Sequence, residues 1–172
     1  MKKYILTGGP GSGKSSIILA LEQLGEYTVR EAAEDYIRLR QSQGITEPWK
    51  EEDFQKEILK LQLRRETRIP LEAERVWLDR GIADGLIYER KGTETFREIE
   101  TEAMKTKYEK VFLIESLKTY EKSVVRRESY EEATVLGEKL RETYEKLGYK
   151  IERIKPGTIE ERLQQILKKI KK

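Results

Sequence analysis

Residues 4–24 constrain the fold of this chain more than any other stretch of it. A short apolar run at residues 4–6 leads into residues 8–15, which read Gly-Gly-Pro-Gly-Ser-Gly-Lys-Ser. An amphipathic run over residues 17–24 follows at once. This order predicts a strand, a glycine loop and a helix, which is the context that a phosphate-binding P-loop requires.

The residue types in the loop predict how a nucleotide would bind there. The glycines let the backbone curl so that several N–H groups face one anion, and the following helix adds its positive dipole end. Lys14 is expected to reach the β- and γ-phosphates, and Ser15 to offer its hydroxyl to Mg²⁺. We therefore expect ATP or GTP with Mg²⁺. The expected nucleotide contacts are Gly8, Gly9, Pro10, Gly11, Ser12, Gly13, Lys14, Ser15 and Ser16.

The composition narrows the chemistry further. The chain has no cysteine and no histidine, so a catalytic acid or base has to be a carboxylate, a lysine or a tyrosine. The net charge of +3 is mild, which does not favour a nucleic-acid partner. No apolar run approaches the ~20 residues of a membrane span, and we expect a cytoplasmic protein. Charged residues make up 39% of the chain, which predicts an ion-pair-rich surface of the thermophilic type.

Predicted strands and helices alternate along the chain and suggest a single domain over residues 1–172. This alternation predicts an α/β fold with three layers, in which helices cover both faces of a parallel sheet. The strands at residues 4–7 and 111–114 are the most apolar and should be central. The other expected strands are residues 27–30, 76–79 and 150–154. The expected helices are residues 14–24, 31–41, 51–69, 82–88 and 95–107, and two helices that open at the capping boxes of residues 129–132 and 158–161.

Ligands of such a sheet bind beyond the carboxyl ends of its strands, so the catalytic groups are expected there. Asp79 ends the third predicted strand, where a P-loop enzyme holds the water shell of Mg²⁺; Ser15 and Asp79 are therefore the expected metal ligands. Arg80 follows at once, and its planar guanidinium suits a bidentate phosphate contact. The alternative for Arg80 is a structural ion pair with Asp79 or Asp84.

A carboxylate also follows the second predicted strand. Glu31 there is a candidate to take the proton from an attacking hydroxyl or to orient that hydroxyl, although an acidic residue in a first helical turn is also favoured by the helix dipole. Glu34 and Asp35 are expected to be solvated. Arg64 and Arg65 on the long helix are expected to form surface ion pairs rather than acceptor contacts.

The segment of residues 116–129 has no clear periodicity and is expected to be a lid. In P-loop kinases such a lid carries arginines that close over the transferred phosphate, so at least one of Arg126 and Arg127 is expected to have that role. Adjacent residues on a helix diverge by about 100°, so at most one of them is expected to point inward. The alternative is that both arginines are solvated. The loop of residues 155–158 follows the last predicted strand. It is a candidate contact for the base, or a simple turn before a capped helix.

The chain resembles the AAA domain type 28 family of small P-loop proteins, which is related to the ribosylnicotinamide-kinase domain of bifunctional NAD-synthesis regulators. The resemblance covers nearly the whole chain. It rests on residues 8–15, 30–33, 79–88, 115, 126–133 and 147–149. It implies a nucleoside-kinase-like fold with five parallel strands in the order 2-3-1-4-5, and a site for NTP and Mg²⁺. The acceptor does not follow from the resemblance.

Two functions fit these residues. The first is a small-molecule kinase that transfers the γ-phosphoryl group to a nucleoside-, nucleotide- or riboside-like acceptor, with catalytic roles for Lys14, Glu31, Asp79, Arg80 and the lid arginines. The alternative is a regulatory NTPase that hydrolyses slowly and acts through a protein partner. The absence of a glutamine just after Asp79 and of a guanine-reading Asn-Lys-x-Asp motif counts against a standard GTPase. Base preference and oligomeric state stay open.

Overall fold

A computed structural model describes residues 1–117 and 130–170. Its sheet has five parallel strands in the order β2-β3-β1-β4-β5, as expected. The strands are β1 (Lys2–Thr7), β2 (Tyr27–Val29), β3 (Arg75–Asp79), β4 (Lys110–Ile114) and β5 (Ile151–Ile154). The parallel strands all end at the edge that carries the predicted site.

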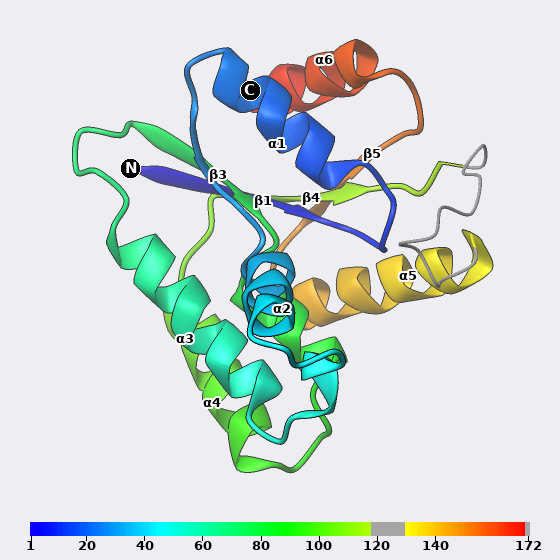
Figure 1. Cartoon of the computed structure of the whole chain (residues 1–172). Coiled ribbons are helices and arrows are strands. Elements are labelled where there is room, and N and C mark those ends of the chain that lie inside the picture. The colour runs from blue at the N-terminus through cyan, green and yellow to red at the C-terminus, as the bar shows by residue number, and fades with distance from the viewer. Residues whose placement is uncertain (118–129, 171–172) are drawn as a thin grey trace.

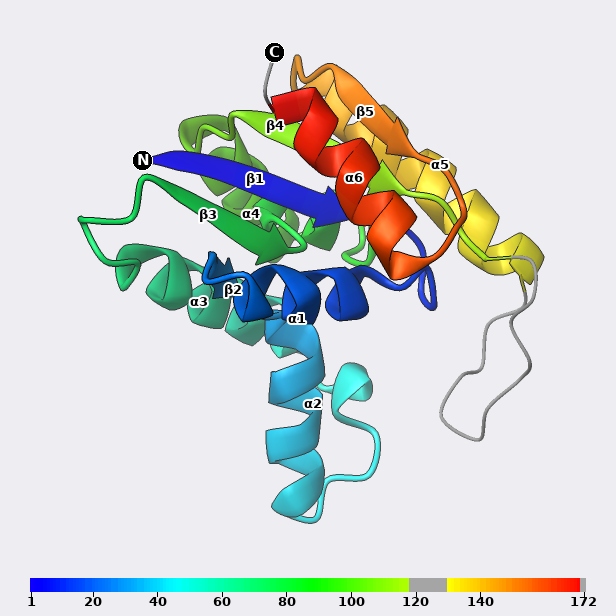
Figure 2. The same ribbon diagram turned by 90° about the horizontal axis from the view of Figure 1, so that it is seen from above.

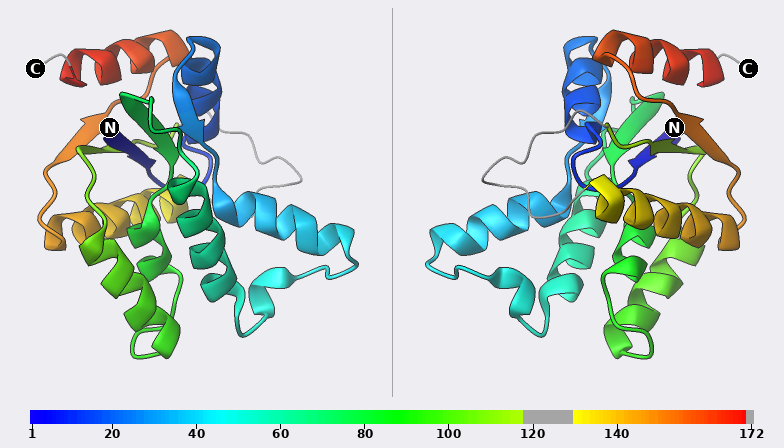
Figure 3. Two further views of the ribbon diagram at one scale, coloured as in Figure 1. Left: turned by 90° about the vertical axis from the view of Figure 1, so that its left-hand side faces the viewer. Right: turned by 90° about the vertical axis from the view of Figure 1, so that its right-hand side faces the viewer.

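Helices cover both faces of the sheet, as Figures 1 and 3 show. One face carries α1 (Lys14–Gln23) and α6 (Ile159–Ile170), and the other carries α3 (Phe54–Thr67), α4 (Glu94–Lys105) and α5 (Tyr130–Lys146). The helix α2 (Ala32–Ser42) projects away from the sheet, as Figure 2 shows from above. No helix in the described part of the chain is long and apolar enough to cross a membrane.

The core forms two layers because the side chains of each strand alternate between the faces of the sheet. Tyr4 and Leu6 pack with the α1 and α6 side, whereas Ile5 packs with the side of α3, α4 and α5. On the α1 side, the rings of Tyr4 and Trp77 stack with their centroids 4.7 Å apart. Both faces of β1 are thus buried, which explains why this strand has an unbroken apolar run in the sequence.

Several expected boundaries differ from the structure. The long helix predicted at residues 51–69 is shorter, because α3 spans Phe54–Thr67. The helix predicted at residues 82–88 is the 3₁₀ helix η2 (Ile82–Ile87), and a further 3₁₀ helix, η1 (Pro48–Lys50), was not predicted. The capping box of α6 is confirmed, since Thr158 N–H donates to Glu161 at 2.8 Å and Glu161 N–H to Thr158 Oγ1 at 3.2 Å. Residue 129 of the other box lies outside the described residues.

Candidate nucleotide-binding and phosphotransfer site

The P-loop joins the end of β1 to the start of α1, as the sequence predicts. Lys14 is 5% exposed, and its Nζ donates to the carbonyl oxygens of Gly8 and Gly9, both at 3.0 Å, and to Ser12 Oγ at 3.3 Å. The ammonium group therefore lies within the curl of the loop, where a bound phosphate would compete with these carbonyl oxygens for it.

Gly9 and Gly13 show why the loop requires glycine. A Cβ at Gly9 would lie 2.0 Å from the carbonyl oxygen of Ala133, so the loop packs directly against the backbone of α5. Gly13 adopts a φ of 87°, a left-handed conformation that glycine takes without a steric penalty, and it is the residue from which α1 begins. A side chain at residue 9 would thus block the contact of the loop with α5, and one at residue 13 would strain the turn into α1.

The environment of Lys14 destabilises its charged form. Burial and the neighbouring Arg80 guanidinium lower the pKa of Lys14 to about 8, although the carboxylates of Asp79, Glu31 and Asp84 oppose the shift. A polyanionic ligand at the loop would supply the missing negative charge and would favour the ammonium form.

Asp79 and Ser15 meet at the end of β3, and their geometry suits a magnesium ion. Ser15 Oγ donates to Asp79 Oδ2 at 2.7 Å, whereas Oδ1 of the same carboxylate is buried and has no hydrogen-bond partner among the described residues. Burial raises the pKa of Asp79, and the charge of Lys14 opposes that shift. No cluster of three or more acidic, histidine or cysteine ligands occurs in the described part of the chain.

Arg80 lies between two carboxylates. Its Nε is 2.9 Å from Glu31 Oε1, its Nη1 is 3.1 Å from Asp84 Oδ1, and the guanidinium also faces the ring of Tyr88. The side chain is only 13% exposed; burial opposes its charge, but Glu31 and the other nearby acidic groups outweigh that effect and hold the pKa of Arg80 well above its usual value. The backbone φ of Arg80 is 69°, a strained value for a residue with a Cβ. The turn therefore fixes the guanidinium at the carboxyl edge of the sheet.

Asp84 is a buried centre of this site, whereas the sequence predicted it only as an ion-pair partner of Arg80. Its carboxylate accepts hydrogen bonds from Thr7 Oγ1 at 2.8 Å, from the Gly81 N–H at 3.2 Å and from Tyr144 Oη at 2.6 Å, besides its ion pair with Arg80. It thereby connects β1, η2 and α5. The short spacing from Arg80 to Asp84 indicates only their ion pair, whereas the bonds to Thr7 and Tyr144 join residues that are distant in the sequence.

The acidic and basic residues around α2 are mostly paired. Asp35, which was expected to be solvated, is 28% exposed and forms an ion pair of 2.7 Å with Arg65. The expectation for Arg65 is thus confirmed, and its Nη1 also donates to the carbonyl oxygens of Arg30 and Glu31 at 2.8 and 3.2 Å. Glu34 is more exposed and pairs with Arg38 on the same helix.

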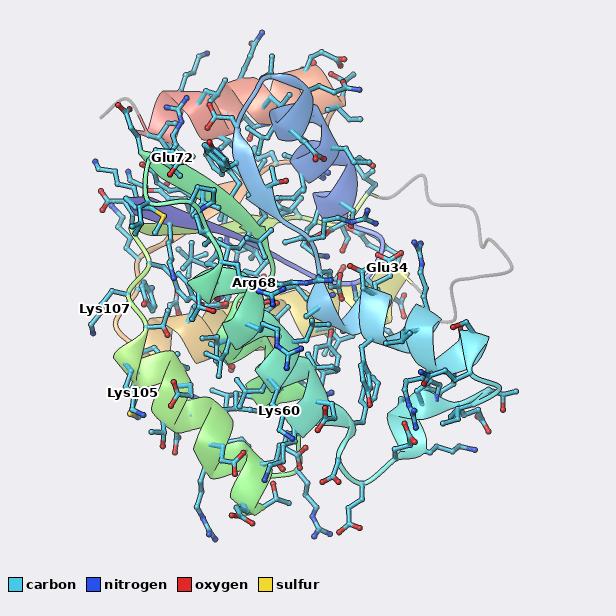
Figure 4. The ribbon with its side chains drawn as sticks, turned by 60° about the vertical axis from the view of Figure 1, so that its left-hand side comes forward. Glu34, Lys60, Arg68, Glu72, Lys105 and Lys107 are labelled. Atoms are coloured by element: carbon cyan, nitrogen blue, oxygen red, sulfur yellow. The ribbon has the colours of Figure 1, made fainter. Side chains whose placement is uncertain are left out.

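A cavity of about 320 Å³ lies at the free edge of β2 and contains none of the P-loop residues. It is lined by Tyr27, Thr28, Val29, Arg30, Arg65, Arg68, Ile69, Pro70 and Val76. Figure 4 places Arg68 near the end of α3, facing the start of α2. The cavity thus borders the segment that leads into Glu31, and is distinct from the nucleotide loop.

The remaining predicted site residues are distributed around this centre. Ser16 follows Ser15 in the first turn of α1 and is exposed. The loop of residues 155–158 connects β5 to α6, and Lys155 N–H donates to Gln165 at 2.9 Å. Arg126 and Arg127 lie outside the described residues, as does most of the predicted lid. The structure therefore brings together Lys14, Ser15, Glu31, Asp79 and Arg80 at one edge of the sheet.

The P-loop between β1 and α1 and the strand order of the sheet define a P-loop protein with the topology of small kinases. A family model for the AAA domain matches residues 3–162, so the chain belongs to that family. No protein with curated annotation matches the chain in sequence.

Solved structures support the fold. The NadR protein in complex with NAD and AMP-PNP is similar with a TM-score of 0.72 and 15% identity over 97% of this chain; the chain spans 49% of that protein, about half its length. Deoxyadenosine kinase from M. mycoides with bound dATP gives a TM-score of 0.62 and 14% identity over 99% of this chain and 100% of that one. Shikimate kinase from Acinetobacter baumannii with shikimate gives 0.57 and 19% identity, over 99% of this chain and 93% of that one.

Proposed function

We propose that this protein is a small-molecule kinase that transfers the γ-phosphoryl group of ATP or GTP to a hydroxyl or phosphate of a nucleoside-, nucleotide- or riboside-like acceptor. The observation that carries the proposal is the Arg80–Glu31 ion pair of 2.9 Å beside the P-loop. A switch protein needs only the loop and the metal ligands, whereas transfer to an acceptor also needs a carboxylate that orients the acceptor and a cation that stabilises the transferred group.

Each residue has a role in this proposal. Lys14 neutralises the β- and γ-phosphates, and Arg80 stabilises the charge that develops on the transferred group. Glu31 binds the acceptor hydroxyl and orients it toward the γ-phosphorus. Asp84 fixes Arg80 through the 3.1 Å contact, so it is a positioning residue. We assign the same charge-stabilising role to one of the two arginines Arg126 and Arg127 of the predicted lid.

The transfer balances with these groups alone. The acceptor oxygen forms a bond to the γ-phosphorus, and the bond from that phosphorus to the β,γ-bridging oxygen breaks, which releases ADP or GDP. The proton of a hydroxyl acceptor passes to the Glu31 carboxylate. Because the transition state of phosphoryl transfer is loose, positioning and electrostatic stabilisation contribute more than strong basicity.

Ser15 and the unpartnered Oδ1 of Asp79 are the residues that would hold Mg²⁺ or its water shell. When bound, the ion neutralises charge on the β- and γ-phosphates. The chain keeps the Asp79 carboxylate buried, at 2% exposure, and leaves its Oδ1 without a hydrogen-bond partner among the described residues.

Mass spectrometry of a phosphorylation assay tests the proposal. Purified protein is incubated with Mg²⁺ and ATP or GTP, with and without pooled nucleosides, nucleotides and ribosides. We expect one species that is heavier by one phosphoryl group and that appears only with its pool. The Glu31→Gln variant in parallel distinguishes transfer at this site from a contaminating kinase.

Hydrolysis that no pool accelerates would contradict the kinase and support the regulatory NTPase with a protein partner. In that case, addition of a cell extract should raise hydrolysis without forming any phosphorylated small molecule. Binding of oligonucleotides that weakens steeply with salt would instead support an acceptor at a nucleic-acid end.

A further inference from the structure

Arg162 lies behind the P-loop, in the first turn of α6, and was not a candidate from the sequence. The residue is 2% exposed, although α6 is otherwise a surface helix that packs beside α1 (Figure 1). Its Nη1 donates to the Ser12 carbonyl oxygen at 2.5 Å, and its Nη2 donates to the Glu115 carbonyl oxygen at 2.6 Å. One guanidinium thus joins the P-loop to the residue that follows β4.

The guanidinium of Arg162 is in close contact with the P-loop. A Cβ built on Gly13 would lie 3.0 Å from Nη1 of Arg162, so the guanidinium rests against the residue that begins α1. A carbonyl that accepts a hydrogen bond from behind the loop is not free to turn toward a bound phosphate, whose oxygens it would repel. Arg162 therefore favours the arrangement of the loop in which N–H groups face the ligand.

Arg162 forms no ion pair with a carboxylate of the described residues. No carboxylate of that part lies within 4.0 Å of the guanidinium, since the Glu115 carboxylate pairs with Arg153 instead, at 3.3 Å. The Nε of Arg162 is buried without a hydrogen-bond partner there. Burial lowers the pKa of Arg162, and Glu115 opposes the shift only in part. A buried cation without a counter-ion is costly, and nearby negative charge reduces the cost.

We infer that Arg162 is a positioning residue for the nucleotide: it holds the Ser12 carbonyl behind the P-loop, and its buried charge is compensated when the phosphates of a nucleotide bind in front of the loop. The inference rests on the nucleotide site of the proposed function. It assigns to α6 a part in nucleotide affinity, besides its part in the core. It gives Arg162 no contact with the reacting atoms.

Calorimetric titration with ADP and Mg²⁺ tests the inference on three variants. Arg162→Gln removes the charge and one or both bonds, and we expect it to weaken ADP binding about tenfold or more. Arg162→Lys keeps the charge but cannot bridge both carbonyl oxygens, so its loss of affinity should be intermediate. Arg153→Gln is the matched control, because it removes an exposed arginine that contacts the side chain of the same Glu115; its ADP affinity should equal that of the wild type.

A role in stability alone predicts a different pattern. If both Arg162 variants melt earlier but bind ADP as the wild type does, the residue is structural and the inference is wrong. If Arg162→Gln does not fold, Arg162→Lys decides the question by itself. At saturating ATP, the kcat of Arg162→Lys should stay within about twofold of the wild type, because a positioning residue for binding alters KM first. A wild-type protein that binds no ADP would instead overturn the proposed function.

Discussion

We expect nucleotide turnover to depend on Lys14 more than on any other residue of the site. Replacing it by alanine or methionine removes the only ammonium group inside the loop curl among the described residues, where it now bonds to the Gly8 and Gly9 carbonyl oxygens. We expect turnover to fall at least about 100-fold, as for other removed electrostatic contacts. The circular dichroism spectrum should be retained, since the variant also relieves a buried charge. A steady-state NTPase or kinase assay that shows undiminished turnover would contradict the site assignment.

The same residue predicts a proton linkage. The pKa of Lys14 is lowered to about 8 in the free protein, so above pH 8 the amine is mostly neutral. Phosphates raise that pKa again, so binding takes up a proton, and affinity falls as pH rises above 8. At about pH 8.5 the uptake should be about 0.7 proton per site. Calorimetry in two buffers that differ in ionisation enthalpy measures it, and Lys14→Met should show none.

Glu31 should affect chemistry and not nucleotide binding. We expect Glu31→Gln to lower kcat by about 100-fold or more, because the amide cannot take the acceptor proton, while the Kd for ADP stays unchanged. Glu34→Gln is the control, since Glu34 lies on the same helix but pairs with Arg38 away from the site. Equal losses of kcat in both variants would remove Glu31 from the site.

At the residue scale, the sequence predicts site residues that belong to local motifs. It does not predict residues whose partners are distant in the sequence. Lys14, Ser15 and Asp79 could be predicted because a P-loop and a strand end are local patterns. The roles of Asp84 and Arg162 could not, because their partners Tyr144 and Ser12 lie far away along the chain. An arginine beside Leu163 in an amphipathic helix is usually a solvated residue.

The capping box of α6 allows a prediction at the scale of one element. Thr158→Ala removes the hydroxyl that accepts from the Glu161 N–H at 3.2 Å, and it should lower the free energy of unfolding by about 1 kcal/mol. Urea denaturation measures this difference. Thr134→Ala on α5 serves as the control and should change stability by less than about 0.5 kcal/mol, because Thr134 only bonds back to its own helix.

The helices and strands that the sequence predicts best are those with a clear apolar periodicity. The strands and the long helices follow from their apolar patterns, and the α6 capping box from two residues three apart. The 3₁₀ geometry of η2 did not follow, because it depends on the buried contacts of Asp84 and on the hydrogen bond from the Ile82 N–H to Tyr108 Oη at 3.2 Å. Such contacts come from other elements and leave no trace in local spacing.

At the scale of the molecule, the charged surface predicts high thermal stability. Arg153 connects Glu115 and Glu138, and Glu138 also pairs with Arg141, so ion pairs form a network across β5 and α5. Networks contribute more at high temperature than isolated pairs do. We expect calorimetry to give a melting temperature above about 60 °C. Because salt screens ion pairs, the melting temperature should be lower in a buffer with about 1 M salt. Melting below that temperature at low salt would contradict a thermophilic character.

The sequence by itself determined the P-loop, the alternation of strands and helices, and the edge of the sheet that carries the site, because each depends on neighbours within a few residues. Only the tertiary structure decided that Glu31 pairs with Arg80, that Asp84 joins three elements, and that Arg162 contacts the P-loop from α6. These contacts depend on which distant segments the sheet order brings together. The role of a buried charged residue therefore depends on partners that are distant from it in the sequence.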